Sequence, residues 1–385
     1  MVYTDKLTAL ATLAATGAFA QSSVQIYGLA DVGFQSNNYK GTAVSGINGN
    51  GSTTSQINVK ATEDLGGGMK ANLFVENDWA LTQTQANTGV ASSIANATNS
   101  AGASWLNSEI KLGLSGGFGT IDAGVVNNKS LTAAVSAQPL GTAIGSGFGS
   151  ILKASAGTGA NTSTVVRFDN SVRYESPAFS GFSVSGYYAA KQTKSNNANV
   201  FSTTLGAYDR AGVQELALSY NNGPISAIAT TQAVDYKDVI VPGAASYLTG
   251  VPVGAAATAG SVKSTINSFA GNYAMGDLTL YAGYQTVKDD KSVSAVDTKA
   301  YVLGAKYVVG ANTFSATSGE LTNDVTAKKS KFYGLGYDYA LSKTTALYAR
   351  YESLKDDGGT VAAVTGFTET NTTRTRSALG LRVAF

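Results

Sequence analysis

The chain has 385 residues, with 27 Lys and Arg against 25 Asp and Glu, and its net charge of +2 is too balanced to indicate nucleic-acid binding. Charged residues make up only 14% of the chain, well below the roughly 25% of an average soluble domain. The complete absence of Cys and His excludes a disulfide framework, thiolate metal sites and every catalytic centre that needs a histidine or thiol, so we predict no enzymatic activity, no cofactor and no metal.

The first twenty residues have the features of a secretory signal peptide. Lys6 precedes an apolar run from Leu7 to Phe19, and Ala18-Phe19-Ala20 offers a small-x-small cleavage site. We therefore predict a signal peptide over residues 1–20 and a mature protein over residues 21–385. The alternative is an N-terminal helix of the mature protein. No later stretch has the roughly 18 consecutive apolar residues that a transmembrane helix needs.

Most of the mature chain consists of short strands of alternating polarity that are joined in pairs by tight turns. In the clearest pair, Ser55–Thr62 alternates and puts Lys60 on its polar face, and the turn Glu63–Gly68 contains three glycines that permit positive φ. Single strands are predicted at Val24–Gln35 and Arg374–Phe385. Further pairs are predicted at Leu106–Ser115 and Thr120–Val126, Ser171–Glu175 and Phe182–Lys191, Gln214–Tyr220 and Pro224–Val234, Thr265–Tyr273 and Leu278–Lys288, Lys299–Val308 and Thr313–Leu321, and Lys331–Tyr339 and Thr344–Lys355.

Long segments without apolar periodicity separate these pairs, at 36–54, 80–104, 127–166, 192–212, 235–264, 289–298, 322–330 and 356–373. Amphipathic strands without helices to cover their apolar faces predict a closed barrel with lipid outside and water inside. We predict an all-β fold, a transmembrane antiparallel up-and-down β-barrel of about 16 strands with short periplasmic turns and long extracellular loops. A soluble propeller would need a fixed repeat length and a blade motif, and neither is present in the sequence.

Four stretches resemble the trimeric general-diffusion porins of Gram-negative outer membranes, in particular their β-proteobacterial branch. They are Ser23-Val-Gln-Ile-Tyr-Gly-Leu-Ala-Asp31, Ala61-Thr-Glu-Asp-Leu-Gly-Gly-Gly-Met-Lys-Ala71, Arg167-Phe-Asp-Asn-Ser-Val-Arg-Tyr-Glu-Ser-Pro177 and Gly380-Leu-Arg-Val-Ala-Phe385. The resemblance implies a homotrimer in the outer membrane, a third loop folded into the lumen and passive flux of small hydrophilic solutes. It also implies that Phe385 is read by the barrel-assembly machinery. Outer-membrane lipid and lipopolysaccharide are the further partners that we expect.

The candidate constriction loop is residues 127–166. It contains Lys129 and Lys153, and from Lys129 to Val166 it has no Asp or Glu. Its glycine-rich segment Gln138–Gly149 has short apolar residues suited to packing against an inner wall. An ordinary surface loop is the alternative, and the resemblance is the main support for inward folding.

Strand parity selects charged residues that face the lumen. As candidates for the pore constriction we choose Arg167, Lys60, Lys111, Glu109, Arg173, Arg376, Arg350 and, from the loop, Lys153. Arg167 is the leading candidate because it lies at the base of the loop and matches a wall arginine of the family. We expect Arg350 to pair with Glu352, and Arg173 to pair with neighbours of Glu175, in ion pairs that stiffen the wall.

The chain also departs from the family. By motif alignment, positions where relatives often have wall arginines are Gln56, Glu109 and Val125. We therefore predict a weakly selective diffusion channel with a slight preference for anions. Two alternatives remain open. One is a substrate-specific channel whose lumenal aromatics, Tyr27, Tyr187, Tyr281 and Tyr348, guide a solute, and the other is a surface adhesin barrel without a transport role.

Overall fold

A computed structural model describes residues 22–39, 42–79, 107–154, 166–190, 212–235, 263–290, 297–357 and 372–385. The predicted signal peptide lies outside these residues. The first strands are β1 (Ser23–Tyr39), β2 (Thr42–Gly49), β3 (Gln56–Gly66), β4 (Met69–Asp78), β5 (Ile110–Gly116) and β6 (Gly119–Asn127), followed by the helix α2 (Lys129–Ser136). The remaining strands are β7 (Arg167–Glu175), β8 (Phe182–Ala189), β9 (Gly212–Asn222), β10 (Ile225–Asp235), β11 (Lys263–Met275), β12 (Leu278–Asp290), β13 (Thr298–Val309), β14 (Asn312–Asn323), β15 (Lys329–Ala340), β16 (Thr345–Asp356) and β17 (Thr372–Ala384).

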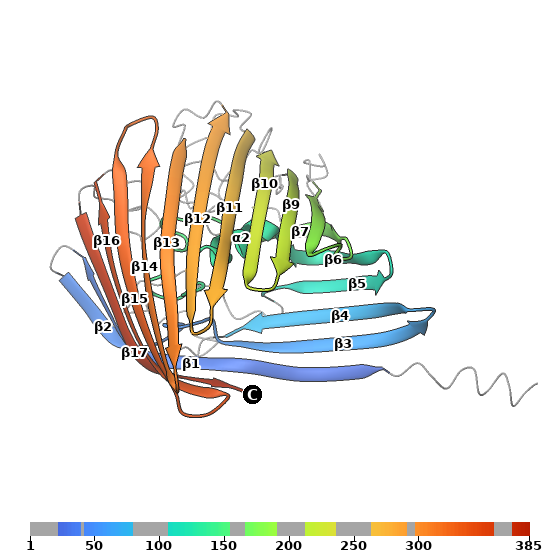
Figure 1. The fold of residues 1–385 in the computed structure, drawn as a ribbon, viewed down its shortest axis with the longest axis horizontal. Helices are drawn as coiled ribbons and strands as arrows, with labels where there is room; N and C mark the ends of the chain where they lie inside the picture. The colour runs from blue at the N-terminus through green and yellow to red at the C-terminus, as the bar shows by residue number, and fades with distance from the viewer. Residues whose placement is uncertain are drawn as a thin grey trace, which may run out of the picture.

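The strands form one closed antiparallel barrel (Figure 1). From β3 to β17 each strand pairs with its neighbours in the sequence, and β1 pairs with β17 from Leu29 opposite Ala384 to Tyr39 opposite Arg374, which closes the sheet. The described sheet has seventeen strands, but β2 and β3 lie on the same side of β1, one along each half of it. They share one position, so the barrel has sixteen positions around its wall, as the sequence predicted.

The two faces of the barrel wall differ in polarity. On β9, Leu216 is 62% exposed on the outside, whereas the adjacent Glu215 is 3% exposed and points inward. Large apolar side chains are exposed along the outer face of most strands, and most of the buried polar and charged groups lie on the inner face. Such a wall is stable only where hydrocarbon covers its outside and water or polar protein fills its inside.

Several strands extend beyond their predicted ends. The segment 36–54 was predicted as a loop, but β1 continues to Tyr39 and β2 occupies Thr42–Gly49. These residues are mostly polar or glycine, because a hairpin that rises above the membrane needs no apolar face, so their sequence lacks the expected periodicity. The predicted loops 289–298 and 322–330 are shortened in the same way by β12, β14 and β15.

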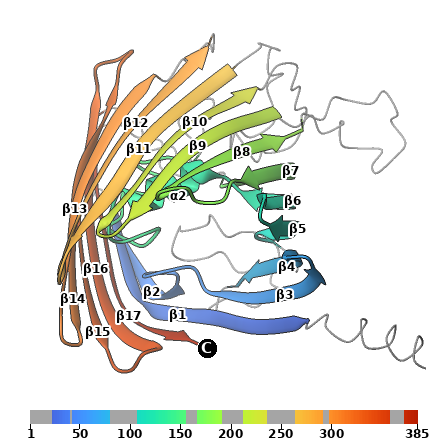
Figure 2. The ribbon, with the colours of Figure 1, turned by 45° about the vertical axis from the view of Figure 1, so that its right-hand side comes forward.

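The third loop lies inside the barrel, and Figure 2 shows α2 within the ring of strands. The helix begins after Asn128, whose side chain accepts a hydrogen bond from the backbone N–H of Leu131 at 2.8 Å. Farther along, Lys153 and the inward-pointing Gln285 of β12 exchange two hydrogen bonds of 2.8 Å through the backbone of Lys153. The inward folding expected of this loop is therefore confirmed for residues 128–154. Within the described residues, no helix has the length and apolar character needed to cross a membrane.

Candidate functional site in the barrel lumen

The start of the loop is attached to the wall by a buried carboxylate. Glu215 of β9 accepts hydrogen bonds from the backbone N–H groups of Lys129 and Ser130, at 2.5 and 3.0 Å, and from the Ser130 hydroxyl at 2.6 Å. Gln232 of β10 donates a further bond of 3.0 Å to the same carboxylate. A negative charge at the first turn of a helix is favourable, because the first backbone N–H groups have no partner within the helix. Glu215 therefore holds α2 against β9 and β10.

A second carboxylate attaches the far part of the loop. Glu352 of β16 accepts a bond of 3.2 Å from the backbone N–H of Gly145, and Arg374 and Arg376 each bind it at 2.8 Å. The loop lies very close to the wall here, because a Cβ added to Gly334 would be only 1.9 Å from the carbonyl oxygen of Gly145. Only glycine at position 334 allows this approach.

Apolar packing completes the attachment of the loop. Ile151 and Leu152 are fully buried against inward-facing side chains that include Val302 and Phe332. Together, the two carboxylates and this apolar cluster hold the described loop against β9 to β16, and the loop narrows the lumen at a defined place.

A group of charged residues, which we call the β4–β7 network, lies on the opposite side of the lumen. Its ion pairs join four cations, Lys111, Lys129, Arg167 and Arg173, to five carboxylates, Glu76, Asp78, Glu109, Asp122 and Glu175. Four positive and five negative charges give a net charge of −1. Every cation in this network thus faces at least one carboxylate within ion-pair distance.

Arg167 and Lys111 illustrate how closely these charges are compensated. The guanidinium of Arg167 lies 3.6 Å from both Glu76 and Asp78. The ammonium of Lys111 lies 3.3 Å from Glu109 and 3.5 Å from Asp122. Glu76 also accepts a hydrogen bond from the hydroxyl of Ser108.

A different charge balance occurs beside β13 to β17. A cavity of about 500 Å³ lies between residues 135–142 of the loop and the wall. Three cations, Lys306, Arg350 and Arg382, and a single carboxylate, Asp338, line it together with neutral residues. We call this site the Lys306 cavity. Its lining has a net charge of +2.

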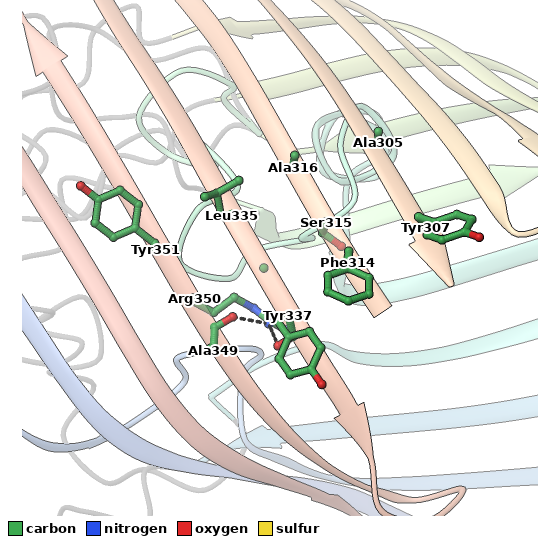
Figure 3. Close-up of a pocket in the computed structure, with 11 residues that line it drawn as sticks. Ala305, Tyr307, Phe314, Ser315, Ala316, Leu335, Tyr337, Ala349, Arg350 and Tyr351 are labelled. Carbon is green, nitrogen blue, oxygen red and sulfur yellow. Dashed lines mark hydrogen bonds between the residues drawn. The ribbon is translucent and has the colours of Figure 1, made fainter. Parts of the chain in front are cut away.

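Two arginines of the Lys306 cavity share its carboxylate. Arg350 binds Asp338 at 2.8 Å and also donates to the Ser52 hydroxyl and to the carbonyl oxygens of Tyr337 and Ala349, as Figure 3 shows for the two carbonyls. Arg382 lies 3.9 Å from Asp338. Lys306 lies 6.0 Å from the ring centre of Tyr281 and has no ion pair with a described carboxylate.

The structure places the predicted site residues in different surroundings. Arg167, Lys111, Glu109 and Arg173 come together in the β4–β7 network. Arg350 lines the Lys306 cavity, and Arg376 binds the Glu352 anchor. Lys60 is exposed on β3 and pairs with none of the described carboxylates, and Lys153 is buried between the loop and β12.

The predicted ion pair of Arg350 with Glu352 is wrong. Arg350 pairs with Asp338 of the neighbouring strand β15, and Glu352 is occupied instead by Arg374 and Arg376 of β17. Arg173 pairs across strands with Asp122 of β6, the strand that also faces Glu175, at 3.0 Å. Residues two apart on one strand point the same way, but the nearest opposite charge is often on the next strand, where directly opposed Cβ atoms are about 5 Å apart.

Sequence reasoning missed Lys306 and the importance of Arg382. Strand parity puts Arg382 on the lumen side. It could also have put Lys306 there, because Lys306 alternates with the outward-facing Leu303 and Tyr307. It could not show that they share a cavity, because β13 and β17 are far apart in the sequence.

Two of the four lumenal aromatic residues are out of reach of a passing solute. Tyr187 and Tyr348 are both buried: Tyr187 donates its hydroxyl to the Val126 carbonyl, and Tyr348 donates its hydroxyl to Asp31 at 2.5 Å. Within the described residues, no group of three or more His, Cys, Asp or Glu side chains is arranged to hold a metal ion.

A closed barrel with an apolar outside and a charged lumen narrowed by a loop defines a channel-forming outer-membrane protein. Comparison with known proteins agrees. The family model for the Gram-negative porin matches residues 7–359, and the chain belongs to this family. It is an outer-membrane protein that crosses the membrane with its strands, and its lumen is a diffusion channel.

One relative and two solved structures match nearly the whole chain, and a second relative matches about half of it. It is 28% identical to outer membrane porin protein 32 of Delftia acidovorans, over 98% of this chain and 99% of that protein. Over 52% of each chain it is 34% identical to major outer membrane protein P.IB of Neisseria gonorrhoeae. Its fold is similar to the anion-selective porin from Comamonas acidovorans, with a TM-score of 0.72 and 23% identity over 95% of this chain and all of that one. The trimer form of OmpT from Vibrio cholerae has a TM-score of 0.62, with 16% identity over 94% of this chain and 99% of that one.

Proposed function

We propose that the channel passes small hydrophilic solutes and ions with weak selectivity and a slight preference for anions. The observation that carries this proposal is the lining of the Lys306 cavity, where three cations face one carboxylate. The loop that forms the other side of the cavity contributes no carboxylate from Lys129 to Val166. A structural relative described as an anion-selective porin supports the same direction.

The weakness of the preference follows from the opposite side of the lumen. The β4–β7 network has a net charge of −1, which favours cations and opposes the cavity. The Debye length is about 10 Å at 0.1 M salt and about 3 Å at 1 M, so both charged regions act on an ion most strongly in dilute solution. We therefore expect the anion preference to fall as the salt concentration rises.

Reversal potentials in a salt gradient test this proposal directly. The mature chain is refolded, inserted into planar bilayers and measured with KCl at two dilute concentrations. A small potential with the sign of anion preference, which decreases at higher salt, is the expected result. A potential with the sign of a strong cation preference would show the proposal to be wrong.

We also propose that the chain has no enzymatic activity, in keeping with its family and fold, which are those of channels. The alternative of a substrate-specific channel loses its main support, because Tyr187 and Tyr348 are buried and cannot contact a passing solute. The adhesin alternative depends mainly on loop segments outside the described residues. Current block by one class of solute that saturates with concentration would favour the substrate-specific channel.

For its partners, we propose a homotrimer and contacts with outer-membrane lipid and lipopolysaccharide. The trimer form of the Vibrio cholerae neighbour supports the first. Mass measurement of the refolded chain in detergent should give three chains per particle, and a stable single-chain particle would contradict it. The small hydrophilic solutes themselves need no dedicated binding site. Recognition of Phe385 by the barrel-assembly machinery, and residues 1–20 as a signal peptide, stay predictions.

A further inference from the structure

Exposed lysines gather on the outer face of β15 and β16, at the end of the barrel that has the long loops. The side chains of Lys329, Lys331 and Lys355 are 48%, 62% and 65% exposed. They point outward because they alternate with Phe332 and Leu354, which are buried on the inner face. These three lysines therefore lie outside the lumen and take no part in the conduction path.

Two of these lysines are directly opposed. Lys331 and Lys355 are cross-strand partners, an arrangement of like charges that destabilises a sheet. Glu320 of β14 is shared by Lys329 at 2.7 Å and Lys331 at 3.3 Å, and Lys355 has Asp357 at 3.4 Å. Three cations thus share two carboxylates. The cluster retains a positive charge that an external anion would neutralise.

The position of the three lysines along the membrane normal indicates which anion they meet. Tyr333 follows Lys331 by two residues, which is about 7 Å along a strand, and its ring lies 5.9 Å from that of Tyr351. Exposed aromatic side chains on β11, β12 and β13, at Phe269, Tyr284 and Tyr301, lie six to eight residues from the tight-turn ends of their strands, as Tyr333 and Tyr351 do. Such aromatic rows lie at the interface between hydrocarbon and headgroups. The lysines above the row therefore lie at the level of the headgroups of the outer leaflet.

The cluster is a local feature of the wall. The strands β8, β9 and β10 contain no lysine or arginine at all. We propose that Lys329, Lys331 and Lys355 bind a phosphate group of the phosphorylated glycolipid of the outer leaflet, with Tyr333 and Tyr351 in contact with the lipid below. This site specifies the lipopolysaccharide contact proposed above and rests on it.

The test compares lipid binding by the refolded full chain in a neutral detergent. The probe is bis-phosphorylated lipid A, and dephosphorylated lipid A and inorganic phosphate are the comparison ligands. The double variant Lys331→Gln/Lys355→Gln removes the opposed charges. Lys288→Gln on β12 is the matched control, because Lys288 is also exposed and outward-facing but lies opposite Thr265.

We expect the double variant to bind bis-phosphorylated lipid A about tenfold more weakly than the wild type, and the control to bind within about twofold of it. Dephosphorylated lipid A should bind the wild type about as weakly as the phosphorylated lipid binds the double variant. Equal affinity of wild type and double variant, or equal binding of the dephosphorylated lipid, would overturn the proposal. Equally tight binding of inorganic phosphate would also overturn it, since the site would then recognise free phosphate.

Two further measurements separate this site from the channel function. Without lipid, the double variant should melt at the same temperature as the wild type or higher, because the opposed charges are gone, and a lower temperature contradicts the premise. Conductance and reversal potential in planar bilayers should be unchanged in the double variant. A strong cation preference of the wild type would contradict the proposed selectivity. The lipid-binding measurement would still be valid, because it is made in detergent and does not depend on conduction.

Discussion

The β4–β7 network and the Lys306 cavity lie on opposite sides of the same lumen and are both rich in cations. In the network, four cations meet five carboxylates, whereas in the cavity three cations meet one. Arg167, the strongest candidate from the sequence, lies between two carboxylates, and Lys306, which the sequence analysis missed, pairs with no described carboxylate. The number of lumenal cations is therefore a poor guide to selectivity, because a cation acts on passing ions in proportion to the charge that its neighbours leave uncompensated.

The largest effect is expected when the cavity is reversed in charge. Lys306→Glu with Arg382→Glu changes its lining from three cations and one carboxylate to one cation and three carboxylates, from +2 to −2. The reversal potential in a salt gradient should then change sign to cation preference. The matched pair Lys306→Gln with Arg382→Gln should bring the potential near zero. An unchanged sign in the Glu pair would show that the cavity does not control selectivity.

A smaller shift of the reversal potential is expected when the β4–β7 network loses a cation. Arg167→Gln leaves Glu76 and Asp78 without their shared cation and changes the network from −1 to −2. The reversal potential should move toward cation preference without the sign change of the cavity variant, and stability should fall by about 1 kcal/mol. Adding Asp78→Asn restores the charge and should restore the potential. A shift of the reversal potential toward anion preference would show that Glu76 and Asp78 do not compensate the charge of Arg167.

Because Glu215 attaches the loop to the wall, we expect its replacement to increase the current noise and to change the selectivity little. Glu215→Gln removes the charge that holds the first turn of α2 and should cost about 2 kcal/mol of unfolding free energy. Single-channel recordings should show larger open-channel current fluctuations, because the loop is less firmly attached. Thr231→Ala, on the outward face of β10, is the control and should record like the wild type. Equal noise in both variants would remove the anchoring role of Glu215.

Lys60 provides the smallest expected effect. It is exposed on β3 and belongs to neither charged region. Lys60→Gln should move the reversal potential slightly toward cations, by less than Lys306→Gln alone. If Lys60→Gln shifted the reversal potential as much as Lys306→Gln does, the position of Lys306 beside the loop would give it no special influence on selectivity.

Strand pairing could be predicted well where one face is apolar and a tight turn follows. The predicted pairing of the strands on either side of Glu63–Gly68 is confirmed, although β3 continues to Gly66 and leaves only Gly67 and Gly68 in the turn. The pairing of β9 with β10 around Asn221–Gly223 is confirmed as well. The extension of β1 and β2 above the membrane was not predicted, because their residues lack an apolar face there. Polar and apolar residues alternate along a strand only where one of its faces contacts lipid. A part of a strand that lies beyond the membrane therefore lacks this alternation in its sequence.

The lumenal site was harder to predict than the wall. Parity placed Arg167, Lys111 and Arg350 on the inner face, but it assigned Arg350 the wrong partner. The anchors of the loop also have no local signal, since Glu215 lies 85 residues beyond Ser130, and Glu352 lies 207 residues beyond Gly145.

The sequence by itself determined the alternation of faces, the turns, the sixteen-position antiparallel wall and the presence of a long loop without carboxylates. Each of these depends on residues a few positions apart, since a strand repeats every two residues and a turn spans about four. Only the tertiary structure decided which lumenal cations are compensated. Closure of the barrel brings β13 and β17 to one cavity beside the loop, and electrostatic compensation depends on distances in space that a strand's own pattern does not contain.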